Sequence, residues 1–191
     1  MKFRKMIFVL TIATSIIFAC MLGSTYAYYT LSNGTVVNVT TGVLDDGVSI
    51  VFTKSEFINL HTGIPISSSD VDSLASVTDF TITPDSSKLA GYDAAINIGF
   101  SNISIDSALK VSDFKYNVTC NNTVIGSGDG TSINGDSVNF GILSTSDGSF
   151  DISKTYNCSV RLWLQDSGVS QNELMNKKFS GYVKVSSVYR K

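Results

Sequence analysis

Short runs in which apolar and polar residues alternate recur along most of the chain. Alternation at a period of two residues puts every second side chain on the same face of a strand, so that one face is buried and the other meets water. The clearest run is 156–164, where five apolar side chains share one face and Arg161 and Trp163 lie on the other. The other predicted strands are 37–43, 48–52, 80–82, 96–100, 114–120, 124–125, 138–142 and 179–185.

Turn-forming residues separate several of these runs. Residues 45–47 (Asp-Asp-Gly) lie between the first two predicted strands, and Asp-Gly favours the tight turn of a hairpin. Asn121 and Asn122 predict a second tight turn, because asparagine tolerates the positive φ that such turns need. Residues 126–136 contain four glycines and two aspartates and are expected to form a flexible loop.

Helical patterns are few and short. Asp70 is expected to cap a helical turn that reaches Leu74, since its carboxylate can accept hydrogen bonds from free N–H groups at a helix start. Ser170 and Glu173 have the spacing of a capping box, which predicts a short helix that ends at about Lys177.

These patterns predict an all-β protein with about nine short strands and one short helix near the C-terminus. Alternating strands are typical of antiparallel sheets with one wet face. Two such sheets packed face to face make an antiparallel β-sandwich, and a jelly-roll-like sandwich is the expected architecture. We expect this domain to span residues 41–191 and to follow an extended N-terminal segment, residues 28–40.

Residues 1–27 have a different character from the rest of the chain. Three basic residues precede an apolar run from Met6 to Gly23, and small residues stand at Thr25 and Ala27. This is the pattern of a secretory signal peptide, with cleavage expected between Ala27 and Tyr28. The leader therefore predicts a secreted protein at the cell surface or outside the cell.

Two alternatives to cleavage stay open. The apolar run is intermediate in length between a signal peptide and a membrane span, so the leader could remain as an anchor. Cys20 lies in a stretch that loosely resembles a bacterial lipobox, in which the cysteine carries a lipid. Residues 28–191 lie outside the membrane whether the leader is cleaved or retained, and a membrane contact is expected through the leader if it stays uncleaved.

Charge limits the classes of partner. Cleavage removes three of the fourteen Lys and Arg residues and none of the sixteen Asp and Glu residues, which leaves a formal net charge of −5. The mature chain has no basic cluster, so the sequence argues against a nucleic-acid partner and against electrostatic binding to an anionic membrane. Its length suits a single domain with a core of ordinary size.

Cys120 and Cys158 are the two cysteines that remain after cleavage. An exported pair can oxidise, and both lie on predicted strands, so we expect a disulfide; the alternative is two buried thiols. A metal site is not expected, because the chain has no CxxC motif and His61 is its one histidine.

The sequence contains no convincing catalytic constellation. It lacks the HExxH and GxSxG motifs, and His61 lies in a polar stretch, so we expect neither an enzyme nor a cofactor. Asp129, Asp136 and Asp147 are interpreted as solvated turn residues, since the full calcium-binding loop pattern is absent. Trp163 could anchor a partner or cover a sheet edge.

Two stretches resemble a known group of exported proteins. The junction Thr25-Tyr26-Ala27-Tyr28-Tyr29-Thr30 is similar to that of Gram-positive secreted proteins processed by the SipW-type signal peptidase, which include the TasA-type biofilm-matrix fibre proteins and the camelysins. The close of the chain, with Leu162-Trp163-Leu164, residues 172–178 and Phe179-Ser180-Gly181, resembles small members of the same group. Residues 54–155 match it in their rhythm of strands alone.

The resemblance implies a jelly-roll-like sandwich with a structural role at the cell surface or in matrix fibres. In the TasA type, the freed N-terminal segment adds as a strand to the next subunit. Its partner would be another copy of the chain or another matrix or surface protein. A monomeric surface adhesin is the alternative function. Camelysins are also catalogued as metallopeptidases, but this chain lacks the ligands. The residues expected in the assembly strand are Tyr28, Leu31, Val36, Val37 and Val39.

Overall fold

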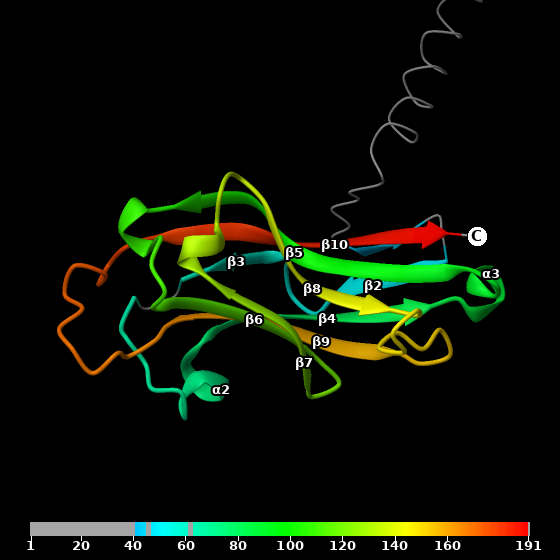
Figure 1. The fold of residues 1–191 in the computed structure, drawn as a ribbon, viewed down its shortest axis with the longest axis horizontal. Coiled ribbons are helices and arrows are strands. Elements are labelled where there is room, and N and C mark those ends of the chain that lie inside the picture. Colours follow the sequence, from blue (N-terminus) through cyan, green and yellow to red (C-terminus); the bar gives the residue numbers. More distant parts are fainter. Residues whose placement is uncertain (1–40, 45–46, 61–62, 191) are drawn as a thin grey trace, which may run out of the picture. The chain divides into compact units, whose positions relative to one another are not determined.

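The computed structural model describes residues 41–44, 47–60 and 63–190. Strands dominate this part of the chain, and the helical segments are single turns (Figure 1). Among these residues there is no helix with the length and apolarity of a membrane span. The strands are β1 (Thr41–Leu44), β2 (Val48–Phe52), β3 (Phe57–Asn59), β4 (Ser76–Pro84), β5 (Asp93–Ile105), β6 (Phe114–Cys120), β7 (Thr123–Asp129), β8 (Val138–Ser144), β9 (Tyr156–Leu164) and β10 (Phe179–Arg190). The helical turns are α2 (Val71–Leu74), α3 (Ser86–Leu89) and the 3-10 turns Ser107–Leu109 and Gly130–Ser132.

The described strands form one hydrogen-bonded sheet of ten strands in the order β1-β2-β4-β9-β6-β7-β8-β5-β10-β3. All of the pairings between these strands are antiparallel. The prediction of an all-β, antiparallel protein is therefore confirmed.

The sheet curls so that β3, at one end of the strand order, faces β4, the third strand from the other end. β3 and β4 are far apart in the strand order, yet the Thr78 hydroxyl of β4 donates a hydrogen bond to the Phe57 carbonyl oxygen of β3 at 3.3 Å. The weakest link in the order joins β7 to β8, which pair through Gly126 and Gly141 alone. The curl brings the inner faces of distant strands together around one core.

The core is built on the faces that the alternation predicts. Ile96, Ile98 and Phe100 of β5 are fully buried. The ring centroid of Phe100 lies 5.3 Å from that of Tyr116 and 5.4 Å from that of Phe179, which joins β5, β6 and β10. Each such aromatic pair contributes about 0.5–1.5 kcal/mol beyond the burial of its area. These contacts fix how the inner strands pack.

Both predicted hairpins are present. β1 and β2 pair antiparallel with Leu44 opposite Val48, on either side of the Asp-Asp-Gly stretch. β6 and β7 pair through the turn at Asn121 and Asn122, whose φ angles are 48° and 65°. The left-handed backbone explains why asparagine occupies both positions.

The predicted helix from Ser170 to about Lys177 is wrong. Residues 172–176 form successive turns, and Asn176 has a φ of 60°, which an α-helix cannot continue through. Gln171 is buried, and its side-chain amide donates to Asp113 Oδ2 at 2.8 Å and to the Gln165 carbonyl oxygen at 3.0 Å. These contacts with the sheet override the local capping pattern.

The predicted flexible loop at 126–136 is also wrong. The strand β7 extends through Asp129, and a 3-10 turn follows it. Gly128 lies against the ring of Tyr116, where a Cβ would come within 2.6 Å of ring atoms. The glycine thus allows a close approach between β7 and a buried side chain rather than a mobile loop.

The helical turn predicted after Asp70 is present as α2, but the expected capping bond is not formed. The Asp70 carboxylate makes no side-chain bond to the helix and instead accepts from the Ser67 hydroxyl at 2.9 Å. A strand absent from the predictions, β3, lies in the stretch between β2 and α2. This missed strand forms one wall of the site described next.

Candidate functional site

An open groove separates β3 from the first residues of β4. β4 pairs with β9 from Ser76 to Ile82, but with β2 only from Phe80 to Pro84. The Thr53 N–H, directly after β2, donates to the Asp79 carbonyl oxygen of β4 at 2.9 Å, and this is the last hydrogen bond of the β2–β4 pairing. Beyond it the chain turns away from β4 toward β3. Among the described strands, β2 therefore leaves the side of β4 opposite β9 before Val77 and Thr78.

The second wall of the groove is β3. This strand pairs with β10 along one side, where the Val183 N–H donates to the Glu56 carbonyl oxygen at 2.7 Å and the Leu60 N–H donates to the Phe179 carbonyl oxygen at 3.0 Å. Main-chain groups of successive residues point to opposite sides of an antiparallel strand. The main-chain groups of Phe57 therefore point away from β10, toward the groove.

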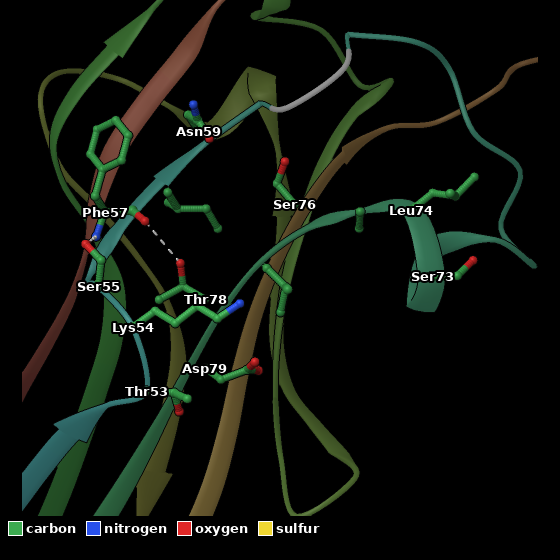
Figure 2. A pocket seen from close by; sticks show the side chains of 13 residues that line it. Thr53, Lys54, Ser55, Phe57, Asn59, Ser73, Leu74, Ser76, Thr78 and Asp79 are labelled. Carbon is green, nitrogen blue, oxygen red and sulfur yellow. Dashed lines mark hydrogen bonds between the residues drawn. The ribbon is translucent and has the colours of Figure 1, made fainter.

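The groove has a volume of about 540 Å³, and exposed apolar side chains are among those that line it. Phe57, Leu74 and Val77 line it with exposed fractions of 43%, 56% and 50%. Ile58 and Thr78, which also line it, are almost fully buried. Figure 2 shows Phe57 on the β3 wall, Thr78 and Asp79 on the β4 wall, and Leu74 beyond Ser76. The groove is thus bounded by two strand edges and by apolar groups.

Side-chain hydroxyls bind both Phe57 main-chain groups that face the groove. The Thr78 hydroxyl donates to the Phe57 carbonyl oxygen at 3.3 Å, as the dashed line in Figure 2 shows. The Phe57 N–H donates to Ser55 Oγ at 3.0 Å. The arrangement suits recognition of an extended peptide, because the main chain of β3 and β4 can bond a third strand and the apolar groups can pack against its side chains.

The residues predicted for cleavage and for the assembly strand lie outside the described residues. The same holds for Cys20 and His61. The predicted cleavage and assembly-strand residues are Ala27, Tyr28, Leu31, Val36, Val37 and Val39.

Cys120 and Cys158 form a disulfide in the structure. They lie directly opposite each other on the neighbouring strands β6 and β9, with Cα atoms 4.1 Å apart, and both are buried. The bond links two central strands across 38 residues of sequence.

The aspartates Asp129, Asp136 and Asp147 do not converge on one point that could hold a metal. Asp129 accepts from the Thr131 N–H at 3.0 Å and lies 3.6 Å from Lys115 Nζ, while Asp147 accepts from the Ser149 N–H at 2.8 Å. Across 41–44, 47–60 and 63–190 there is no group of three His, Cys, Asp or Glu residues placed to bind a metal ion.

Trp163 lies half-buried on the outer face of β9, opposite Lys115 of β6. Its indole N–H donates to Gln165 Oε1 at 3.1 Å. The neighbouring Arg161 donates to the Thr119 hydroxyl at 3.0 Å and lies 3.6 Å from Asp72 Oδ1. The polar atoms of both side chains are therefore engaged within the protein.

Four exposed turns share one hydrogen-bonding pattern and predict an acid-sensitive stability. In each, an Asp carboxylate accepts from the N–H of the Ser or Thr two residues later, and interactions with the side chain and main chain of that residue lower the pKa of the carboxyl. Because the folded pKa is below the unfolded value of about 4, the stability they contribute is complete above that value and is lost as pH falls below it. The four aspartates are Asp85, Asp129, Asp147 and Asp151.

Urea unfolding at a series of pH values checks this prediction. We expect the free energy of unfolding to fall steadily as the pH drops from about 5 toward 2. The substitution Asp151→Asn, which removes the carboxylate that bonds Ser153 and Lys154, should make this fall shallower. A free energy of unfolding that does not change over this pH range would contradict the prediction.

Sequence reasoning missed the groove because it missed β3. Only two consecutive apolar residues, Phe57 and Ile58, mark this strand, and a run of that length shows no period. The only indication in the sequence was that residues 54–75 lack a clear alternation of apolar and polar residues, as expected where a sheet is interrupted.

No protein-family model matches the chain. No curated protein and no solved structure matches it either.

Proposed function

We propose that this protein is a secreted, non-enzymatic structural subunit of the cell surface or the extracellular matrix. It assembles when the N-terminal segment of one copy adds as a strand to another copy. The open groove between β3 and β4 is the observation that carries this proposal, since it offers strand edges together with exposed apolar groups. We further propose that the curled sheet is a β-sandwich of the jelly-roll type.

The added strand is residues 28–40, which removal of the leader between Ala27 and Tyr28 would free. This segment has thirteen residues and no charged side chain, so the α-ammonium group of the freed Tyr28 is the one charge that it brings to the groove. Fully extended it would reach about 40 Å, which is ample for pairing with the short open edges of β3 and β4. Its apolar residues at positions 37 and 39 share one face of a strand.

Exposed apolar side chains in the groove support an interface rather than a solvated surface. Phe57, Leu74 and Val77 all line the same groove, while singly scattered apolar residues are ordinary on a protein surface. Main-chain bonds along the edge would supply affinity, and these side chains would supply register and selectivity. The neighbouring copy is the partner that this arrangement fits.

Electron microscopy and sedimentation of the chain 28–191 test the proposal. We expect wild-type protein to form fibres at a rate that rises with its concentration, and a chain without residues 28–40 to stay monomeric while its circular dichroism keeps the β-sheet signature. The absence of fibres under all conditions, or fibres that persist after this deletion, would count against strand addition.

A substitution in the groove gives an independent test. Val77→Asp places a charge among the apolar groups that the added strand would cover, and we expect it to abolish fibres because an unpaired charge resists burial. The matched control is Val124→Asp, since Val124 is exposed to a similar extent, 58%, but lies on β7 and does not line the groove. Equal loss of fibres in both variants would show a general effect of added charge.

A further inference from the structure

The edge of β3 is covered in a way that bears on when a strand can add to it. Natural sheets protect their edges, because unpaired main-chain groups invite pairing with other chains. Here two hydroxyls provide the protection: Ser55 Oγ accepts from the Phe57 N–H at 3.0 Å, and the Thr78 hydroxyl donates to the Phe57 carbonyl oxygen at 3.3 Å. Both bonds use the main-chain groups that face the groove.

An added strand needs the same two groups of Phe57. Antiparallel and parallel pairing both require the N–H and the carbonyl oxygen of an edge residue to bond the newcomer's main chain. The hydroxyls therefore compete with the strand, and each must give up its bond before pairing is complete. Residues 28–40 of a second copy are the occupant considered, so the inference rests on the proposed function.

The two hydroxyl bonds are suited to exchange. The bond from Thr78 is longer than the usual 2.7–2.8 Å or so between two oxygens, so a main-chain donor can replace it favourably. Thr78 is 5% exposed, and a buried hydroxyl that loses its acceptor needs another. A carbonyl oxygen of the incoming strand can serve as that acceptor, which keeps every group bonded after the exchange.

We propose that Ser55 and Thr78 form a latch that holds the edge of β3 closed in the free subunit and slows strand addition. The latch keeps newly made subunits apart at low concentration. It opens when the Ser55 side chain rotates and the Thr78 side chain moves away from the edge of β3.

Elongation rates of variants of the chain 28–191 test the latch. Thr78→Val removes the donor while nearly keeping the shape, and Ser55→Ala removes the acceptor at an exposed position. Since one hydrogen bond is lost in each, we expect elongation about fivefold faster than in the wild type, and faster still in the double variant. Thr78→Ser keeps the hydroxyl and should elongate at about the wild-type rate.

A further control is Ser73→Ala. Ser73 lines the same groove, but its hydroxyl donates to the Asp70 carbonyl oxygen, so its loss should leave the rate unchanged. Thermal unfolding of each variant verifies that it folds, and Ser55→Ala alone suffices if Thr78→Val does not. Hydrogen exchange of the Phe57 amide in the monomer should be faster in Ser55→Ala than in the wild type.

The outcomes separate the latch from the proposed function. Faster elongation in the latch variants, or fibres from these variants alone, supports the latch. Fibres of wild type that elongate as fast as or faster than those of both latch variants overturn the latch and leave strand addition standing. The absence of fibres from the wild type and from every variant overturns both.

Discussion

Replacing Cys120 and Cys158 together by alanine is expected to lower the free energy of unfolding by about 4 kcal/mol. The disulfide joins residues 38 apart in sequence, so cutting it returns a large loop of the unfolded chain to its full freedom. Since ordinary domains are stable by about 5–15 kcal/mol, this change removes a considerable part of the total. Urea unfolding followed by circular dichroism measures it.

Reduced wild-type protein is the control for this double variant. Alanine at two buried positions also removes the sulfur atoms from the core, while reduction leaves them in place. We expect the reduced protein to lose most of the 4 kcal/mol or so and the double variant slightly more. An unfolding midpoint that reduction does not shift would mean that the cross-link adds little to the stability of the sheet.

The substitution Gly126→Ala is expected to lower the free energy of unfolding by about 3 kcal/mol. Gly126 pairs with Gly141 at the single register position that joins β7 to β8. A Cβ built on Gly126 would collide with the carbonyl oxygen of Phe140, which is main chain and cannot rotate away. β7 and β8 must therefore separate at Gly126 and Gly141, which form their single paired position.

Val124→Ala is the matched control for Gly126→Ala. Val124 lies on the same strand and is 58% exposed, so its truncation should change the free energy of unfolding by less than about 0.5 kcal/mol. Hydrogen exchange should locate the damage of Gly126→Ala in β7 and β8. Equal free energies of unfolding of the two variants would contradict the prediction, because β7 and β8 would then accommodate the Cβ without loss of stability.

Much of the fold follows from local pattern, because burial on one face repeats every two residues. The inward residues of β6 and β9 agree with the prediction, and so do Phe80 and Ile82 of β4, whereas the buried Thr78 of β4 lies before the predicted strand 80–82. The hairpins were predicted for the same reason, since the chemistry of a turn lies within a few residues. The antiparallel, all-β class is a direct consequence of these local features.

What local pattern does not contain is the order of the strands and the contacts that override short motifs. The residues at 172–176 have the sequence of a helix start, but buried Gln171 binds them to the sheet through Asp113 and Gln165. β3 becomes a strand because β10 lies beside it, and its own sequence is too short to specify one. The groove depends on the placement of β3 beside β10, which is a long-range contact, and so could not be predicted.

The position of β10 has a consequence for how the chain matures. This last strand lies between β5 and β3, with Val183 opposite Phe100 and Ser180 opposite Asn59 (Figure 1). Such a high contact order makes folding slow, since pairing must wait for segments distant in sequence. Among the described strands, β3 pairs with β10 alone, so it cannot join the sheet until β10 has reached its place beside β5. A subunit therefore cannot present the β3 edge to another copy before its own sheet has closed over β10.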